Sequence, residues 1–229
     1  MDLLTKMLSL AAAGSMLVSG ALNRAAPQHD PSGNLFLVNR QEMVSEAYEP
    51  AELQEAKVPG RVRQMRPDAA EALEEMFAAC KEETGITLTS VSGYRSYTRQ
   101  ENIYRRKLRS VKNNIEKAQE YVAPPGTSEH QLGLAMDVGQ QNKVSLNVSF
   151  GETKGGIWMR ENCWRFGFIL RYGEEWESVT GYKYEPWHFR YVGKELAKEI
   201  HEANMPLETW LLGYRVQVLT ELLTEDPGT

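Results

Sequence analysis

The spacing of apolar residues along the chain predicts a sequence of helices and strands. In residues 67–84, apolar side chains recur every three or four positions, as in a helix with one buried face. A proline begins this segment and a glycine follows it, which is typical of helix ends. Residues 86–91 alternate β-branched side chains with other residues, so we expect a half-buried strand directly after the helix.

The rest of the chain also reads as helices and strand-like runs joined by loops. Helical spacing predicts further helices at 98–108, 107–120, 157–166 and 194–204, and a final amphipathic segment to about residue 223. Strand-like runs lie at 35–39, 168–172 and 181–192, whereas the polar, glycine-containing residues 142–156 predict a long loop. A helix–strand–helix half followed by a strand-rich half predicts an α+β fold, with a mainly antiparallel sheet and flanking helices.

Composition narrows the class of protein. A chain of 229 residues suits one domain of ordinary size, and its 41% hydrophobic and 25% charged residues are those of a soluble globular protein. The net charge of −5 gives no support to nucleic acid or an anionic membrane surface as the main partner. The net charge does not exclude an acidic substrate, because a single arginine in the binding site can outweigh the weak electrostatic field of the whole protein.

The first residues predict an exported protein. Residues 7–22 form an apolar and small-residue run after Lys6, and Ser19-Gly20-Ala21 has the small-x-small pattern of a signal-peptidase site. An uncleaved anchor with N-terminal membrane association and an ordinary helix are the alternatives. Residues 24–34 read as a linker that contains His29. We therefore expect a leader and linker over 1–34 and an extracytoplasmic location, secreted or attached to the cell envelope.

The two cysteines do not indicate a thiolate metal site. Cys80 and Cys163 show no CxxC spacing, and each sits in an amphipathic stretch. Two buried thiols are the main interpretation. A single disulfide is the alternative for an exported protein.

Two short stretches hold the residues that can carry chemistry. PPGTSEHQLGLAMD, residues 124–137, and YKYEPWHFR, residues 182–190, contain two of only four histidines. We interpret His130, Asp137 and His188 as ligands of one Zn²⁺ ion, a donor set that leaves a position for water. Glu185 would act on that water. The alternatives are packed core histidines, a buried Asp137 paired with an arginine, and His201 as the ligand in place of His188.

This interpretation requires two local distortions of the backbone. A seven-residue offset between His130 and Asp137 has the wrong parity for one face of a straight strand, so we expect a bend at Gly133. Pro186 disfavours a helical Glu185, and Glu185 is out of phase with His188 on an ideal strand. A local distortion is therefore expected there as well.

The motifs resemble those of a known family. SEHQLGLAMD is similar to the SxHxxGxAxD motif, and EPWH to the ExWH motif, of the VanY-type D-alanyl-D-alanine carboxypeptidases. SGYRSYTRQ, residues 92–100, resembles the substrate-side segment of these zinc peptidases, which trim the stem peptides of bacterial cell walls. The likeness runs over about 35–212, which we interpret as one zinc-peptidase domain, and leaves 213–229 as a C-terminal helix and tail.

The resemblance assigns a role to each matching residue. It implies one Zn²⁺ ion held by His130, Asp137 and His188, with Glu185 as the catalytic acid and base. It also implies an anion-binding Arg95 in the catalytic site. The pocket around the terminal residue of the substrate would be lined by Arg95 with Gln100, Ser128, Tyr172 and Trp187.

The resemblance also implies an activity and its alternatives. The expected reaction is removal of the C-terminal D-alanine from peptidoglycan stem peptides by a D,D-carboxypeptidase. An L,D-carboxypeptidase acting on tetrapeptide stems and a D,D-dipeptidase are alternatives with the same motifs. A zinc-containing module that only binds cell-wall peptides is the non-enzymatic alternative, and the presence of Glu185 argues against it. The oligomeric state is left open by the sequence.

Overall fold

A four-stranded sheet lies at the centre of the molecule. The structure is a computed structural model that describes residues 29–30, 32–141 and 144–224. The sheet has the order β3-β4-β6-β5, and every neighbouring pair is antiparallel. Its strands are β3 (Leu88–Ser92), β4 (Ala135–Gln140), β5 (Phe168–Leu170) and β6 (His188–Tyr191). The predicted α+β class with a mainly antiparallel sheet is therefore confirmed.

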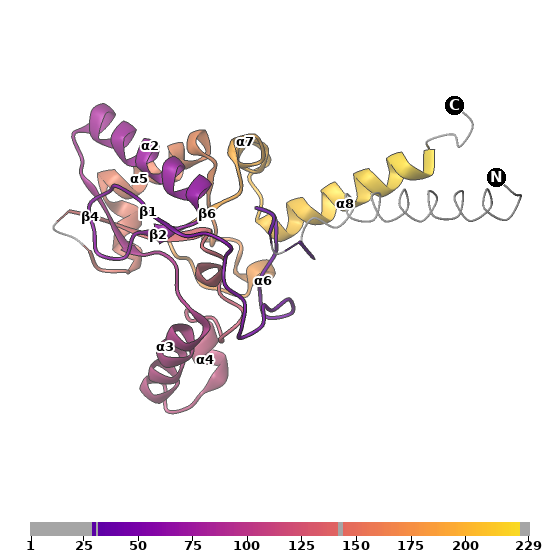
Figure 1. Ribbon diagram of the computed structural model, residues 1–229, viewed down its shortest axis with the longest axis horizontal. Coiled ribbons are helices and arrows are strands. Elements are labelled where there is room, and N and C mark those ends of the chain that lie inside the picture. Colours follow the sequence, from indigo (N-terminus) through magenta and orange to yellow (C-terminus); the bar gives the residue numbers. More distant parts are fainter. Residues whose placement is uncertain (1–28, 31, 142–143, 225–229) are drawn as a thin grey trace, which may run out of the picture.

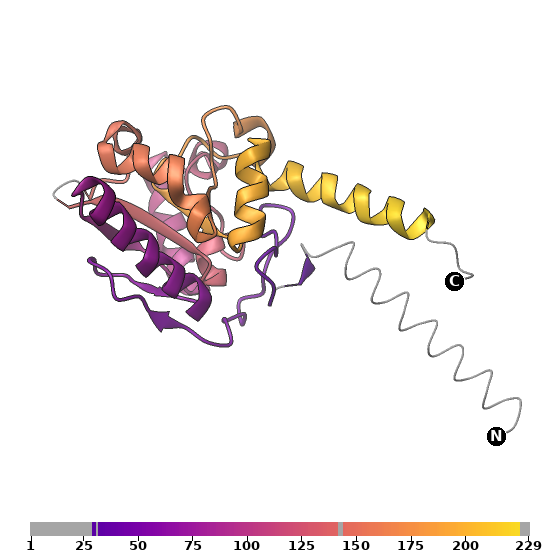
Figure 2. The same ribbon diagram turned by 90° about the horizontal axis from the view of Figure 1, so that it is seen from above.

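One face of this sheet packs against helices and forms the main core. Helices α2 (Pro67–Thr84) and α5 (Lys154–Asn162) lie alongside it (Figures 1 and 2). Met136 of β4 and Phe189 of β6 are fully buried in the same cluster as Met76 of α2 and Met159 of α5. Because successive side chains of a strand point to opposite faces, the neighbours of Met136 and Phe189 face away from these helices.

The opposite face of the sheet is the polar one. In the β4–β6 ladder Asp137 lies directly across from His188, and Ala135 across from Arg190. These positions alternate with the core residues Met136 and Phe189. The register therefore places an acid and a histidine side by side on the face that α2 and α5 leave uncovered.

The remaining elements surround the sheet. A small hairpin joins β1 (Gln54–Glu55) to β2 (Gln64–Met65). Helices α3 (Tyr97–Ser110) and α4 (Ile115–Gln119) form a unit that stands out from the body, and α8 (Leu207–Thr224) extends away from it (Figure 1). The other elements are η2 (Glu129–Leu132), η3 (Val148–Glu152), η4 (Cys163–Phe166), α6 (Glu177–Thr180) and α7 (Lys194–Ala203).

A second apolar cluster attaches the last two helices to the sheet. Ile169 of β5 packs with Ala197 and Ile200 of α7 and with Leu207 and Leu211 of α8. The first two turns of α8 are thereby held against the body, although the rest of the helix extends beyond it (Figure 2). Among the described residues, no helix has the length and apolar character needed to cross a membrane.

Four predicted elements differ from the structure, and one of them is the loop expected at 142–156, which contains η3 and the start of α5. Residues 35–39 bury Phe36 and Val38 but form no strand, because the carbonyl of Phe36 accepts a hydrogen bond from the Arg190 side chain. The predicted strand 181–192 is paired only over β6, since Pro186 has no N–H to donate. The predicted helix 107–120 is interrupted at Lys112 and Asn113, whose φ angles are 56° and 61°. These residues form a turn, and the two ends of the predicted helix belong to α3 and α4.

Two other expectations have different outcomes. The predicted leader lies in residues 1–28, outside the described residues, so it stays a prediction. Cys80 and Cys163 are both free, buried thiols, as in the main interpretation of the sequence. Burial raises the pKa of the Cys163 thiol to about 12.

Candidate metal centre

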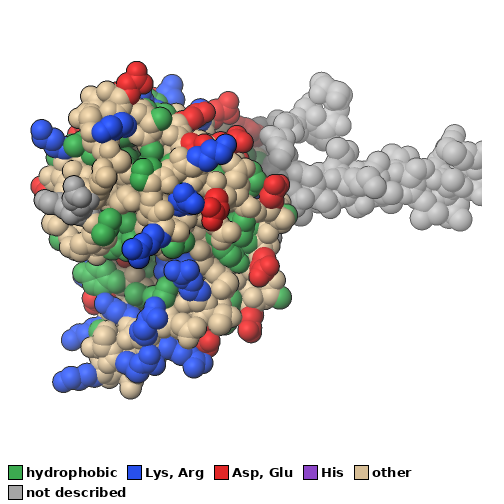
Figure 3. Space-filling view, turned by 60° about the vertical axis from the view of Figure 1, so that its left-hand side comes forward, with side chains coloured by type: hydrophobic (Ala, Val, Ile, Leu, Met, Phe, Trp, Pro, Cys, Tyr) green, Lys and Arg blue, Asp and Glu red, His purple; other side chains and the backbone are tan. Residues whose placement is uncertain are grey.

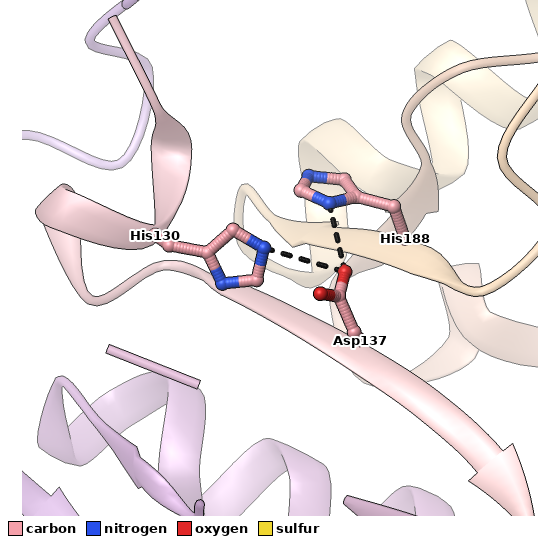
Figure 4. Close-up of side chains that lie close together, drawn as sticks. All are labelled: His130, Asp137 and His188. Atoms are coloured by element: carbon pink, nitrogen blue, oxygen red, sulfur yellow. Dashed lines mark hydrogen bonds and ion pairs between the residues drawn. The ribbon is translucent and has the colours of Figure 1, made fainter. Parts of the chain in front are cut away.

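Two histidines and one aspartate meet on the polar face of the sheet. His130 comes from η2, Asp137 from β4 and His188 from the first position of β6, and the three side chains point toward one another (Figure 4). Asp137 Oδ1 is 3.3 Å from His130 Nε2 and 3.1 Å from His188 Nδ1. All three residues are buried, and one ligand atom from each lies within 4.8 Å of the others.

The local backbone explains how residues from two distant segments converge. Gly133 ends η2 with φ +69°, a left-handed conformation that glycine adopts without strain. This bend turns the chain from η2 into β4, so that His130 and Asp137 face the same point in spite of their seven-residue offset. His188 is brought to that point by the β4–β6 register, in which it pairs with Asp137.

The hydrogen bonds of His130 leave one ring nitrogen available to a metal. Its Nδ1 is 2.8 Å from the carbonyl oxygen of Gly93, which can only accept, so Nδ1 carries the proton. Burial, helped by the charge of Arg95, lowers the pKa of His130 to about 4, and the ring is therefore neutral. Nε2 then presents a lone pair, is buried, and has no hydrogen-bond partner among the described residues. A cation between Nε2 and Asp137 would satisfy both.

His188 is held between two carboxylates. Its Nδ1 faces Asp137 Oδ1 and its Nε2 faces Glu129 Oε2, each at 3.1 Å. Burial disfavours the imidazolium, yet the hydrogen bonds to Asp137 and Glu129 raise the pKa of His188 to about 9. A metal ion at Nδ1 would replace the proton there, while Nε2–H continues to donate to Glu129. The donor set of two imidazoles and one carboxylate is that of a catalytic zinc site with one open position.

Glu185 lies beside this cluster, and its carboxylate is buried. Its Oε2 is 4.0 Å from His188 Nδ1, and the residue is 6% exposed. The predicted distortion is present: the peptide N–H of Glu185 donates to Tyr172 O, and that of His188 donates to Glu185 O, both at 3.1 Å. Burial raises the pKa of Glu185 to about 8. A carboxyl group with such a pKa can both take up and release a proton near neutral pH.

Arg95 follows β3 and also reaches the cluster. Its Nη2 is 4.0 Å from Asp137 Oδ2, while its Nε is buried without a hydrogen-bond partner among the described residues. Its backbone N–H donates to His130 O at 3.0 Å, which ties the two segments together. An arginine with an unused N–H donor is suited to bind an anionic group of a ligand.

A cavity of about 50 Å³ joins most of the predicted residues. Arg95, Gln100, Ser128 and Tyr172 line it together with His130, Glu185 and His188. The Gln100 side chain is oriented by a 2.6 Å hydrogen bond from Nε2 to Ala123 O. Trp187 is placed differently from the prediction: it packs in the main core, on the other face of the sheet from its neighbour His188.

Comparison with known proteins connects this geometry to a family. The family model described as VanY, D-alanyl-D-alanine carboxypeptidase, matches residues 62–194. The chain belongs to the VanY family. The family predicted from the motifs is thus confirmed, and this VanY-family chain is a peptidase of the hydrolase class.

Three relatives of this VanY-family chain span most of its described residues. The Bacillus subtilis (strain 168) protein YodJ is 45% identical over 190 residues, which are 79% of this chain and 68% of YodJ. The structure of the LdcB LD-carboxypeptidase matches with a TM-score of 0.73 at 45% identity, covering 79% of this chain and 86% of LdcB. A mutant of the D,D-pentapeptidase VanY in complex with Zn(II) matches with a TM-score of 0.67 at 34% identity, over 80% and 99% of the two chains.

One buried residue next to the candidate ligands of this VanY-family chain escaped the sequence analysis. Glu129 is 1% exposed, and its Oε1 accepts hydrogen bonds from Arg171 Nε at 2.7 Å and Arg190 Nη1 at 2.8 Å. Arg171 in turn pairs with Glu208 of α8 through both Nη atoms. The Coulombic pull of both arginines outweighs burial and holds the pKa of Glu129 well below its usual range. Glu129 therefore stays ionised and fixes the tautomer of His188.

A weak signal for this network was present in the sequence. Residue 129 is a variable position of the family motif, so the motif gave it no role. Arg171 and Arg190, however, lie in or next to the strand-like runs FILRY and HFRY, where a charge needs a partner. Two buried arginines predict at least one buried acid, but the pattern does not say which acid.

We expect Glu129→Gln to weaken zinc binding about 10–100-fold. The uncharged amide is a weaker acceptor than the carboxylate for the Nε2–H of His188, so it holds the ring less firmly. The free energy of unfolding should also fall by about 3–5 kcal/mol, since Arg171 and Arg190 lose a shared buried counterion. Competition with a chelating dye at constant pH measures the affinity, and urea unfolding of the metal-free protein measures the stability.

The control for this variant is Glu75→Gln. Glu75 is exposed and forms a surface ion pair with Lys194, so its loss should change the unfolding free energy little and leave zinc affinity unchanged. Equal zinc affinity in Glu129→Gln and the unmodified protein would show that Glu129 has no positioning role.

Proposed function

We propose that this chain is a zinc-dependent carboxypeptidase that removes the C-terminal D-alanine from peptidoglycan stem peptides. The observation that carries the proposal is the convergence of His130 Nε2 and His188 Nδ1 on one carboxylate oxygen of Asp137, with Glu185 beside them. The closeness of the three donors to one point supports a single ion.

The catalytic work divides between the metal and Glu185. A bound Zn²⁺ supplies a Lewis acid that polarises the scissile carbonyl and makes water more acidic. Glu185 takes the proton from the attacking water and then gives it to the leaving amine, so one carboxyl group serves as base and acid. Its buried position and raised pKa support this role, because the protonated form is stable enough to exist during the reaction.

Arg95 would select the end of the peptide. A carboxypeptidase must recognise the free carboxylate of the last residue, and a guanidinium binds a carboxylate with two parallel hydrogen bonds. Arg95 lines the same cavity as His130 and Glu185. In this position it would hold the terminal carboxylate while the preceding carbonyl lies at the metal centre. Gln100, Ser128 and Tyr172 would contact the terminal residue in the same cavity.

A second candidate is an L,D-carboxypeptidase that acts on tetrapeptide stems. The observation in its favour is the match to the LdcB LD-carboxypeptidase, which has both a higher identity and a higher TM-score than the match to VanY. The two candidates share the metal centre, Glu185 and Arg95. They differ in the stereochemistry of the residue before the cleaved bond.

The proposed substrate also suggests a location. Peptidoglycan stem peptides belong to the cell envelope, and the apolar residues 7–22 have the pattern of an export signal. We therefore propose that the enzyme acts outside the cytoplasm.

The proposal predicts zinc-dependent loss of a single alanine from a defined muropeptide. Purified full-length protein incubated with a pentapeptide muropeptide should yield the tetrapeptide, followed by mass spectrometry. A metal chelator should abolish this product, and added Zn²⁺ should restore it. Product from the tetrapeptide muropeptide in place of the pentapeptide would select the L,D-carboxypeptidase, and release of an intact dipeptide would refute both candidates.

Glu185→Gln should retain zinc but lose turnover by about 10²–10⁴-fold, because the amide keeps the shape of the side chain and cannot transfer a proton. Elemental analysis measures the zinc content, and hydrolysis of the preferred muropeptide measures kcat. The control is Glu175→Gln, which alters an exposed glutamate and should keep full activity. Turnover in Glu185→Gln equal to that of the control would refute the proposed role.

Arg95→Lys should lower kcat/KM by about 10–100-fold, mainly through KM, because lysine keeps the charge and loses the bidentate geometry. Steady-state kinetics with the free-acid peptide measures this change. A peptide with a C-terminal amide provides the matched control: its poor hydrolysis should not worsen further in Arg95→Lys. If Arg95→Lys lowers kcat/KM for the amide by the same factor as for the free acid, Arg95 does not act on the terminal carboxylate.

A further inference from the structure

A strongly basic region adjoins the metal centre on α3 and α4. From Tyr97 to Gln119 the chain has seven basic and two acidic residues, a net charge of +5 in a protein of net charge −5. Figure 3 shows Lys and Arg side chains gathered over the part of the surface where α3 and α4 stand out from the body. The basic residues are Arg99, Arg105, Arg106, Lys107, Arg109, Lys112 and Lys117.

Three of these arginines line one hollow. The hollow has a volume of about 560 Å³, and its walls are Ser96, Thr98, Arg99, Asn102, Arg106 and Arg109. Except for the first two, these residues are spaced by three or four positions and so lie along one face of α3. We call this surface the α3 hollow. It begins at Ser96, directly after Arg95 of the candidate active site.

The arginines of the α3 hollow are not used by the fold. Arg99, Arg106 and Arg109 are exposed, and none of them has an ion-pair partner within the described part of the chain. The neighbouring Arg105, by contrast, pairs with Glu101 at 2.8 Å. Like charges on one helix face repel each other, so this arrangement lowers the stability of the protein. A bound anion would relieve the repulsion.

We propose that the α3 hollow binds a linear polyol-phosphate polymer, with Arg99, Arg106 and Arg109 contacting its phosphates. The planar guanidinium group binds phosphate with two parallel hydrogen bonds. At a rise of about 1.5 Å per residue, the three arginines are separated by about 10 Å and about 5 Å along α3. Such a row fits repeated charges on a chain better than a single small anion.

Other polyanionic partners fit the α3 hollow less well. Proteins that bind single-stranded nucleic acid usually combine basic and aromatic side chains, and the residues lining this hollow include no aromatic one. A membrane surface is flat, whereas these arginines line a concave surface. A polyol phosphate has only uncharged carbon and hydroxyl groups between its phosphates. It therefore needs no aromatic side chains for stacking and no apolar side chains for insertion into a bilayer.

This inference goes beyond the proposed hydrolysis and is tested without it. The probe is fluorescently labelled linear poly(glycerol phosphate), titrated with the full-length protein and followed by anisotropy. The variant Arg99→Gln/Arg106→Gln/Arg109→Gln should bind the probe at least about tenfold more weakly. The slope of log affinity against log salt concentration should also fall by about two to three, since each arginine releases about one counterion.

The matched control removes the same charge from other surfaces. Arg61, Arg160 and Arg215 are also exposed, and the triple variant Arg61→Gln/Arg160→Gln/Arg215→Gln should keep the affinity within about twofold. Neither triple variant should melt below the unmodified protein, because all six side chains are exposed, and loss of the repulsion on α3 can only raise the melting temperature of the Arg99/Arg106/Arg109 variant. Equal losses of affinity in the two variants would reduce the effect to net charge and overturn the proposal.

Three further probes distinguish the chemistry of the partner. A polyglutamate of equal charge and a single-stranded oligonucleotide of equal charge should each bind more weakly than poly(glycerol phosphate). Vesicles containing phosphatidylglycerol should bind equally well to the unmodified protein and the Arg99/Arg106/Arg109 variant. Tighter binding of either polymer, or vesicle binding that requires the three arginines, would overturn the assignment to a polyol-phosphate polymer.

Discussion

The candidate site depends on the position of one buried carboxylate. Asp137 is 4% exposed, and its Oδ1 is the common neighbour of His130 Nε2 and His188 Nδ1. A carboxylate among apolar residues is costly unless cations or hydrogen-bond donors surround it. The β4–β6 register and the left-handed Gly133 provide this environment together. A one-residue slip of β6 would turn His188 into the core and leave the carboxylate without its partner.

The buried charges behind the metal centre connect distant parts of the chain. Glu129 joins His188 to Arg171 and Arg190, and Arg171 extends the network to Glu208 in α8. Arg190 also donates to the carbonyls of Asn34 and Phe36. The two acids and two arginines balance in charge, so burial is tolerated through mutual pairing. The C-terminal helix and the segment before β1 thus take part in orienting His188, one of the candidate metal ligands.

The two faces of the sheet separate stability from chemistry. α2 and α5 cover one face with an apolar core, whereas the candidate metal ligands lie on the other. The wall of the cavity is completed by residues near α3 and α4, among them Gln100 and Ala123. The sheet therefore holds the candidate ligands, whereas the basic α3–α4 unit stands out from the body (Figure 1).

The sequence by itself determined what depends on local spacing. It predicted the helix over 67–84 and the α+β class, because periodicity is a property of short segments. It predicted the gathering of His130, Asp137 and His188 because two motifs that resemble those of a known family contain them. Only the tertiary structure decided that residues 35–39 form no strand, that Trp187 faces the core, and that Glu129 supports His188. Each of these features depends on a residue far away in the sequence. Phe36 bonds to Arg190, the β4–β6 register decides the face of Trp187, and Glu129 bonds to a ring 59 positions away. Pairing across such separations follows from packing, which no local pattern encodes.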